Sequence, residues 1–128
     1  MKKLTNAEED VMQILWNIGK GFVKDVIDKM PDPKPPYNTV STVIRILEKK
    51  EFISHTQYGN TYEYYPVVSR EEYAKIHFNG FLSNYFNNSF PKMAAFFARE
   101  NNLSMKELEE IIRLTEEELK ETNNTDHE

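Results

Sequence analysis

Apolar side chains recur at helical spacing in the first thirty residues. Thr5 followed by Glu8 is typical of a capping box, and Gly19 and Gly21 are typical of a helix end, so a first helix is predicted between them. Its apolar stripe comprises Ala7, Val11, Ile14, Leu15 and Ile18, with Met12 and Trp16 beside it. A second stripe, within residues 22–30, comprises Val23, Val26, Ile27 and Met30. The next residues, PDPKPP, exclude regular structure because proline lacks an amide donor.

The stretch from Tyr37 to Lys49 is rich in β-branched residues, which strands favour. Its apolar positions nevertheless follow the i, i+3, i+4, i+7 spacing of one helix face; they are Val40, Val43, Ile44 and Leu47. At 100° steps the polar residues fall opposite; they are Asn38, Ser41, Thr42, Arg45 and Lys49. We therefore predict a third helix whose exposed N-terminal half is small and polar, with Thr39 among its residues.

Two short runs of strand-favouring residues follow at 53–58 and 61–67. Gly59 and Asn60 separate them, which predicts a hairpin with a tight turn. Three helices followed by a β-hairpin make a winged helix-turn-helix. The expected fold is therefore mainly α with a small β-hairpin, and residues 1–67 are expected to form a winged-helix DNA-binding domain.

The C-terminal half has a different pattern. Ser69 with Glu72 and Ser104 with Glu107 predict two further helix starts, and Ser89 can cap a short helix between them. Both long helices carry more apolar surface than this half of the chain can cover, which predicts a second, identical chain. The expected interface comprises Phe78, Leu82, Tyr85, Leu108, Ile111, Ile112, Thr115 and Leu119. We expect a helical dimerisation domain at residues 68–122 and a disordered tail at 123–128.

Composition narrows the class of protein. The chain of 128 residues has no cysteine and no apolar run long enough to cross a membrane, so we expect a cytoplasmic protein without membrane insertion. Its net charge of −5 is uneven, because residues 1–67 hold nine basic and nine acidic residues whereas residues 68–128 hold seven and twelve. A basic domain is the usual mark of DNA binding. The neutral N-terminal half therefore argues against simple, charge-driven binding to nucleic acid, and all of the acidity lies in the C-terminal half.

The polar face of the third helix is the candidate DNA-binding surface. The second helix of a helix-turn-helix enters the major groove. There Asn38 can pair with adenine, Thr39 and Thr42 can contact a thymine methyl group, and Ser41 can reach either base type. Arg45 and Lys49 can bind phosphates or a guanine edge. The alternative is a merely solvated face with Asn38 as a helix cap, but such faces usually carry Glu, Lys or Gln.

The hairpin is a weaker candidate. Tyr58, Asn60 and Thr61 at its tip can contact the backbone or minor groove of DNA. Tyr62 and Tyr64 are expected to pack on the helices instead. The tip carries no lysine or arginine, so its contribution to affinity should be small.

Catalysis and metal binding find little support. The three histidines, His55, His77 and His127, lack the spacing of a metal site, and the chain has no glycine-rich phosphate loop. His77 is expected to pack against aromatic rings. We therefore expect a protein that is not an enzyme and that needs no cofactor.

Four segments together resemble the penicillinase-repressor family, the BlaI/MecI transcriptional regulators. They are LTNAEEDVMQILW, YNTVSTVIRILEKKEFI, YGNTYEYYPVV and LSMKELEEIIRLTEEE, and the resemblance covers about residues 4–121. It implies a dimeric winged-helix repressor that binds inverted repeats in promoters. Asn38, Thr39 and Ser41 match the family positions that face bases, and Tyr37 precedes them at the helix start.

The resemblance also implies a way of lifting repression. In the resistance repressors, a membrane-bound sensor protease pathway that responds to β-lactams leads to a cut between an Asn and a Phe in the C-terminal domain. The corresponding place here is Phe96 and Phe97, so the Asn is absent and a different protease specificity is one alternative. The alternative for the whole chain is a winged-helix protein–protein interaction module without DNA binding.

Overall fold

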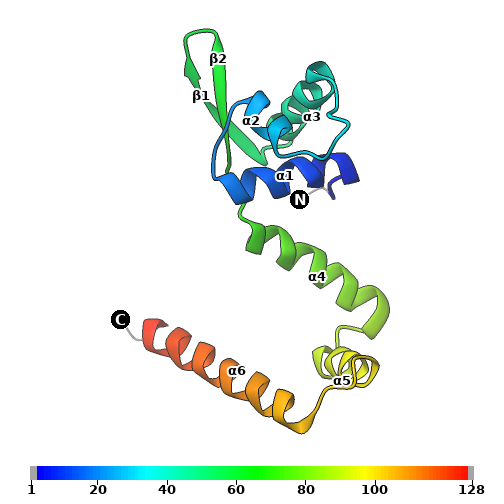
Figure 1. The fold of residues 1–128 in the computed structure, drawn as a ribbon. Helices are drawn as coiled ribbons and strands as arrows, with labels where there is room; N and C mark the ends of the chain where they lie inside the picture. Colours follow the sequence, from blue (N-terminus) through cyan, green and yellow to red (C-terminus); the bar gives the residue numbers. More distant parts are fainter. Residues whose placement is uncertain (1–2, 127–128) are drawn as a thin grey trace. The chain divides into compact units, whose positions relative to one another are not determined.

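The computed structural model describes residues 3–126 and divides the chain into two compact units, Met1–Gly80 and Phe81–Glu128. The first holds the helices α1 (Asn6–Ile18), α2 (Val23–Asp28) and α3 (Tyr37–Lys49) and the strands β1 (Ile53–Tyr58) and β2 (Thr61–Pro66). The boundary falls within α4 (Arg70–Phe86), and the second unit holds α5 (Phe90–Glu100) and α6 (Met105–Asp126). Figure 1 shows the hairpin extending from the edge of the three-helix group. The predicted winged-helix fold with C-terminal helices is confirmed.

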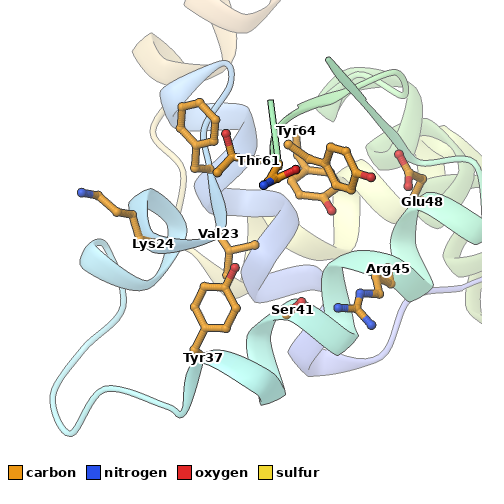
Figure 2. A pocket seen from close by; sticks show the side chains of 11 residues that line it. Val23, Lys24, Tyr37, Ser41, Arg45, Glu48, Thr61 and Tyr64 are labelled. Atoms are coloured by element: carbon orange, nitrogen blue, oxygen red, sulfur yellow. The ribbon is translucent and has the colours of Figure 1, made fainter. Parts of the chain in front are cut away.

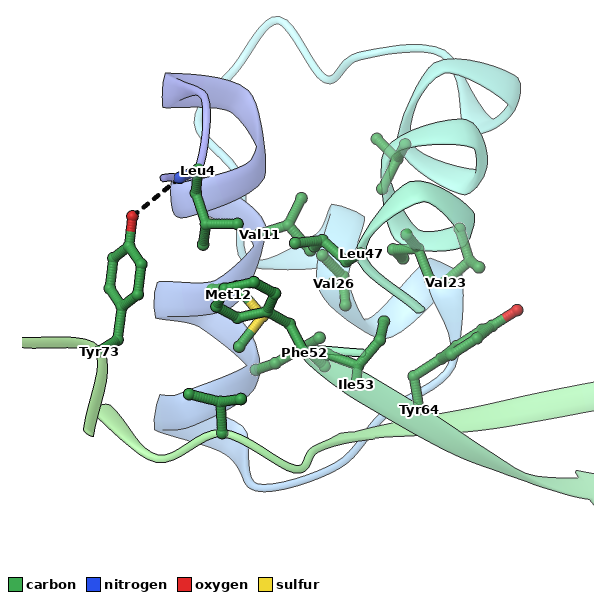
Figure 3. Packing of buried hydrophobic residues seen from close by; sticks show 14 residues of the cluster. Leu4, Val11, Met12, Val23, Val26, Leu47, Phe52, Ile53, Tyr64 and Tyr73 are labelled. Atoms are coloured by element: carbon green, nitrogen blue, oxygen red, sulfur yellow. Dashed lines mark hydrogen bonds between the residues drawn. The ribbon is translucent and has the colours of Figure 1, made fainter. Parts of the chain in front are cut away.

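The core of the first unit lies where the three helices and the base of the hairpin meet (Figure 3). Its fully covered side chains come from every one of these elements and from the turn after α3; they are Val11, Met12, Leu15, Val26, Ile44, Leu47, Phe52 and Ile53. Burial of such side chains is the main favourable term in folding. The helical stripes read from the sequence therefore form one continuous core.

The ends of α1 follow the sequence signals. The Thr5 side chain accepts a hydrogen bond from the amide of Glu8, and the Glu8 carboxylate accepts one from the amide of Thr5, which completes the capping box. Gly19 ends the helix at φ 84°, a conformation that favours glycine. Gly21 does not end the helix, because its amide and carbonyl pair with those of Tyr64 at 2.9 and 2.8 Å.

The hairpin pairs β1 with β2 in antiparallel register from Ile53 opposite Pro66 to Tyr58 opposite Thr61. The predicted tight turn at Gly59 and Asn60 is confirmed, with Gly59 at φ 60°. Because Gly21 bridges to Tyr64, the segment between α1 and α2 also attaches to the base of the hairpin. This attachment supports a two-stranded sheet that would be marginal alone.

The first turns of α4 belong to the first unit. The Tyr73 hydroxyl accepts a hydrogen bond of 3.0 Å from the Leu4 amide, and the Tyr73 ring packs edge-on against Phe52. The Trp16 indole donates to the Val68 carbonyl at 2.8 Å. His77 lies one turn further, 2.6 Å from the Tyr73 hydroxyl, so its predicted packing against an aromatic ring is confirmed.

The second unit is held by an aromatic cluster, which comprises Phe81, Tyr85, Phe86, Phe96 and Phe97. Ser89 caps α5 as predicted. α6 continues through Asp126, so the helix extends into residues 123–126, where the tail was expected to begin; the disorder of that tail stays a prediction. Residues 127–128 lie outside the described residues. Over residues 3–126, no helix has both the length and the apolar character to cross a membrane.

Candidate nucleic-acid interface

The polar face of α3 is held outward by the core on its other side. Val40, Ile44 and Leu47 are buried, and most of the predicted contact residues are exposed; these are Tyr37, Asn38, Thr39, Thr42, Arg45 and Lys49. Short polar side chains are uncommon on the solvated face of a helix, where Glu, Lys and Gln lose less rotamer freedom. The geometry thus presents a row of small hydrogen-bonding groups to the surroundings.

The start of α3 removes the simplest competing explanation for Asn38. The residue that caps this helix is Pro36, and no side chain makes a capping hydrogen bond there. Asn38 therefore lies inside the first turn, with its amide group exposed. Thr42, one turn on, donates its hydroxyl to the Asn38 carbonyl at 2.8 Å. Its hydroxyl proton is thereby used, so its methyl group and the lone pairs of its oxygen remain for a contact.

The expectation that Ser41 faces outward is wrong. Ser41 is only 7% exposed, although the neighbouring Thr42 is exposed. At 100° per residue Ser41 lies only about 60° from Ile44 around the helix, so it borders the buried face. Ser41 faces the hairpin and the start of α2 across a pocket that all three line (Figure 2).

The hairpin tip presents Tyr58, Asn60 and Thr61 to solvent, as predicted. Thr61 donates its hydroxyl to the Tyr58 carbonyl at 2.8 Å, which fixes the turn. Of the two tyrosines expected to pack on the helices, Tyr64 does so, but Tyr62 remains 41% exposed. Tyr62 packs instead on the imidazole of His55, with ring centroids 4.4 Å apart.

A side-chain contact that the sequence did not predict joins the hairpin to α3. The Nδ1 atom of His55 lies 2.5 Å from the Glu48 carboxylate. No sequence signal could have found it, because the two residues belong to different elements and only the fold brings them together. Burial, and to a lesser degree the nearby negative charge of Glu48, raises the pKa of the Tyr64 hydroxyl above its ordinary 10.0. The wing is thus fixed against the same helix that carries the polar face.

A pocket of about 610 Å³ lies between α3, the start of α2 and the hairpin (Figure 2). Four aromatic side chains are part of its lining, which also contains the buried Ser41. Arg45 and Tyr37 border it from α3, and Asn60 and Thr61 border it from the wing. Several residues predicted to contact DNA therefore also line this pocket.

The remaining predicted residues lie mostly in the second unit. Tyr85, Ile111, Ile112, Thr115 and Leu119 are exposed, and Leu82 and Leu108 are half-buried. Phe78 belongs to the first unit and is half-buried. Phe96 and Phe97 lie within α5 and are exposed. Within the described range, no group of three His, Asp or Glu side chains is placed to hold a metal ion; His127 lies outside that range.

Comparisons with known proteins agree on one family. Residues 4–117 match the model of the penicillinase repressor family. The Penicillinase repressor of Bacillus licheniformis is 26% identical over 125 residues, covering 91% of this chain and 94% of that protein. The Methicillin resistance regulatory protein MecI of Staphylococcus aureus (strain N315) is 24% identical over 110 residues, covering 85% and 89%. A solved DNA-binding domain of the repressor BlaI covers 57% of this chain and 94% of its own, at 26% identity and a TM-score of 0.49.

Proposed function

The chain belongs to the penicillinase repressor family of winged-helix transcriptional repressors, and from this premise we propose that it acts as a homodimer on an inverted-repeat DNA operator. The observation that carries the proposal is the exposed row of short polar side chains on α3, opposite a face on which Val40, Ile44 and Leu47 are buried. The family consists of transcriptional repressors rather than enzymes. Repression follows from occupancy, because a protein bound over a promoter excludes the polymerase.

Each side chain of the α3 face has a proposed partner. Asn38 pairs with an adenine, and the methyl groups of Thr39 and Thr42 contact thymine methyl groups. Tyr37 contacts the DNA at the helix start, and Arg45 and Lys49 bind phosphates or a guanine edge. Ser41 is left out of the base contacts because its side chain is buried.

The wing has a smaller role in this proposal. Tyr58, Asn60 and Thr61 are exposed at its tip and lie against the DNA backbone or minor groove. None of these residues carries a positive charge, so they add little of the salt-dependent affinity that comes from phosphate contacts. Their substitution should weaken binding less than substitution of Arg45 or Lys49.

Dimerisation supplies the affinity that one domain lacks. Residues 1–67 have no net charge, and in our proposal they bind DNA, whereas residues 68–122 pair two chains. Two half-sites add their binding free energies, and a pair of chains fixes the half-site spacing at one helical turn of DNA, about 34–36 Å, or a multiple of it. The exposed apolar side chains of α6 support this pairing, because a lone helix of this kind leaves them in water.

A pair of substitutions on α3 tests the recognition surface. DNase footprinting of the purified chain on its own upstream region first defines the operator. Asn38→Ala should then lower operator affinity by about 1–3 kcal/mol while hardly changing binding to random DNA, because it removes a base contact. Lys49→Ala should weaken binding to operator and random DNA alike. It should also reduce, by about 1, the slope of the logarithm of the binding constant against the logarithm of the salt concentration. Equal losses on both DNAs for Asn38→Ala would contradict the assignment of α3.

The neutral charge of residues 1–67 favours one rival, a winged-helix module that binds protein and not DNA. A salt titration separates the two functions. DNA binding must weaken steeply as salt rises, because phosphate contacts release counterions, whereas an apolar protein interface hardly responds. Operator binding that is absent at low salt would favour the rival.

We also propose that proteolysis near Phe96 and Phe97 relieves repression. Phe96 stands where the resistance repressors have Asn, and both side chains are exposed in the middle of α5. The helix must open locally before a protease can bind it in extended form. Mass spectrometry of the chain from cells exposed to a β-lactam should show a fragment ending at Phe96, absent from untreated cells. An intact chain in induced cells, or a cut elsewhere, would contradict this site.

A further inference from the structure

The pocket between α3, α2 and the wing has the size and lining of a small-molecule site. Its volume of about 610 Å³ is within the range of about 300–1,000 Å³ that ligand pockets usually have. The walls include four aromatic rings: Phe22 from the segment before α2, Tyr37 from α3, and Tyr62 and Tyr64 from β2. A flat aromatic molecule can therefore contact rings from three directions.

Two deeply buried hydroxyl groups open into this pocket without a protein partner. Ser41 is 7% exposed and Tyr64 is 5% exposed, and neither hydroxyl has a hydrogen bond to any residue in the described part of the chain. Among the described residues every fully covered side-chain nitrogen or oxygen has a partner, so both hydroxyl oxygens keep some exposed surface, and both residues line the cavity. Figure 2 shows them on opposite walls, Ser41 on α3 and Tyr64 on the hairpin. Buried polar groups are normally paired, so this pair suits an occupant that hydrogen-bonds.

The charges around the pocket favour an anionic occupant. Arg45 lies one helical turn after Ser41 on the same side of α3, so its guanidinium and the Ser41 hydroxyl can bind one carboxylate together. Lys24 adds a second positive charge at the edge. Glu48 is the negative group of the lining, and its carboxylate is already engaged by His55 at 2.5 Å. The lining therefore has a net positive charge next to its aromatic walls.

We propose that this pocket binds a planar aromatic carboxylate, with the carboxylate on Arg45 and Ser41 and the ring among the tyrosines. The ligand releases the repressor from DNA, and this consequence rests on the proposed function. Tyr37, Arg45, Asn60 and Thr61 belong both to the pocket lining and to the proposed DNA contacts, so ligand and operator compete for the same groups. Because binding linkage is reciprocal, operator DNA must lower the affinity for the ligand by the same factor.

Titration calorimetry of the full chain with 2-naphthoate tests the site without DNA. We expect one saturable site per chain with a Kd below about 1 mM, as two aromatic rings and a carboxylate allow. The neutral isostere 2-naphthamide should bind at least about tenfold more weakly, since it cannot form the charge-assisted hydrogen bonds to Arg45. No saturable binding of 2-naphthoate, or equal affinity for the two compounds, would overturn the proposal.

Three variants locate the binding. Arg45→Gln should weaken 2-naphthoate binding at least about tenfold, and Tyr64→Phe, which keeps the ring and removes the hydroxyl, about fivefold. Lys49→Gln is the matched control, because Lys49 is an exposed cation one turn after Arg45 that does not line the pocket. Its 2-naphthoate affinity should be unchanged. Unchanged affinity in Arg45→Gln, or equal losses in Arg45→Gln and Lys49→Gln, would place the ligand elsewhere and refute the site.

Competition on operator DNA tests the regulatory part separately. Saturating 2-naphthoate should weaken operator binding at least about fivefold, and 2-naphthamide at the same concentration should weaken it less. Simultaneous binding of operator and 2-naphthoate without loss of affinity would overturn the release mechanism. If the chain binds 2-naphthoate as described but no operator, the proposed function fails while the ligand site stands, so the two failures are distinguishable.

Discussion

Glu8 shows how one residue can serve both a local and a distant role. It completes the capping box at the start of α1, as the sequence predicted, but it is also 4% exposed and bonded to Lys50 after α3. The Lys50 Nζ donates to both carboxylate oxygens, at 2.8 and 2.7 Å. Burial alone would raise the pKa of Glu8, but the hydrogen bonds from Lys50 and Thr5 together outweigh it and hold that pKa below its ordinary 4.5.

This ion pair predicts a specific loss of stability. Lys50→Met leaves a buried carboxylate without its cation and should lower the free energy of unfolding at pH 7 by about 2–4 kcal/mol. Asp10 has an exposed carboxylate on the same helix, so Asp10→Asn is the control and should change the free energy of unfolding by less than about 0.5 kcal/mol. Urea unfolding followed by circular dichroism measures both. A loss for Lys50→Met no larger than for the control would mean that the pair contributes nothing.

The lowered pKa of Glu8 also fixes the sign of a pH dependence. A group whose pKa is lower in the folded state stabilises the fold above its unfolded value, here 4.5, and loses that contribution as the pH falls through the folded pKa. The stability of the unaltered chain should therefore fall toward that of Glu8→Gln below about pH 4.5. Thermal melts at pH 7 and pH 3 measure the gap between the two proteins. If the difference in melting temperature between the two proteins is the same at pH 7 and pH 3, the lowered pKa of Glu8 does not contribute to stability.

At the scale of the element, α3 reconciles strand-favouring residues with a helix. Its β-branched residues Val40 and Ile44 are buried against α1 and α2, where their stiffness costs little because packing fixes them anyway. The apolar spacing predicted this face correctly, but it could not predict which flank the hairpin covers. Ser41 lies on the flank of α3 that faces the hairpin and is buried, whereas Thr42 lies on the other flank and is exposed.

Two isoleucines of α3 provide a matched comparison. Ile44 is fully buried at 0% exposed, whereas Ile46 is 41% exposed. Ile44→Ala should lower the free energy of unfolding by about 2–5 kcal/mol, because it removes buried methyl groups and leaves a cavity. Ile46→Ala should lower it by less than about 0.5 kcal/mol. Denaturant unfolding of the two variants measures both free energies of unfolding. Similar losses of stability in the two variants would show that Ile44 does not face the core.

At the scale of the whole molecule, the two units differ in what covers their apolar side chains. The first unit buries its apolar faces internally, whereas α6 leaves Ile111, Ile112, Leu114 and Leu119 exposed. Large exposed apolar patches on a protein mark interaction surfaces. Together with the acidic excess of residues 68–128, this places the proposed pairing surface in the half of the chain that DNA would repel.

A double substitution on α6 tests that pairing surface. Leu108→Asp with Ile112→Asp should give single chains in sedimentation velocity at concentrations where the unaltered protein forms pairs, because charges in an apolar interface are strongly unfavourable. Operator affinity should fall by at least about a hundredfold as the second half-site is lost. Glu110→Gln with Glu117→Gln, on the opposite side of the helix, is the control and should leave the pairs intact. Pairs that survive the aspartates would refute this interface.

The sequence by itself determined the elements, because helical spacing, capping residues and the Gly59 turn act between near neighbours. It therefore predicted α1, α3 and the hairpin, the winged-helix order and the exposed position of Asn38. Only the tertiary structure decided which distant groups come together: Glu8 with Lys50, Glu48 with His55, and Ser41 in the same pocket as the tyrosines of the wing. Such contacts depend on the angles at which elements pack, and no local pattern in the chain specifies those angles.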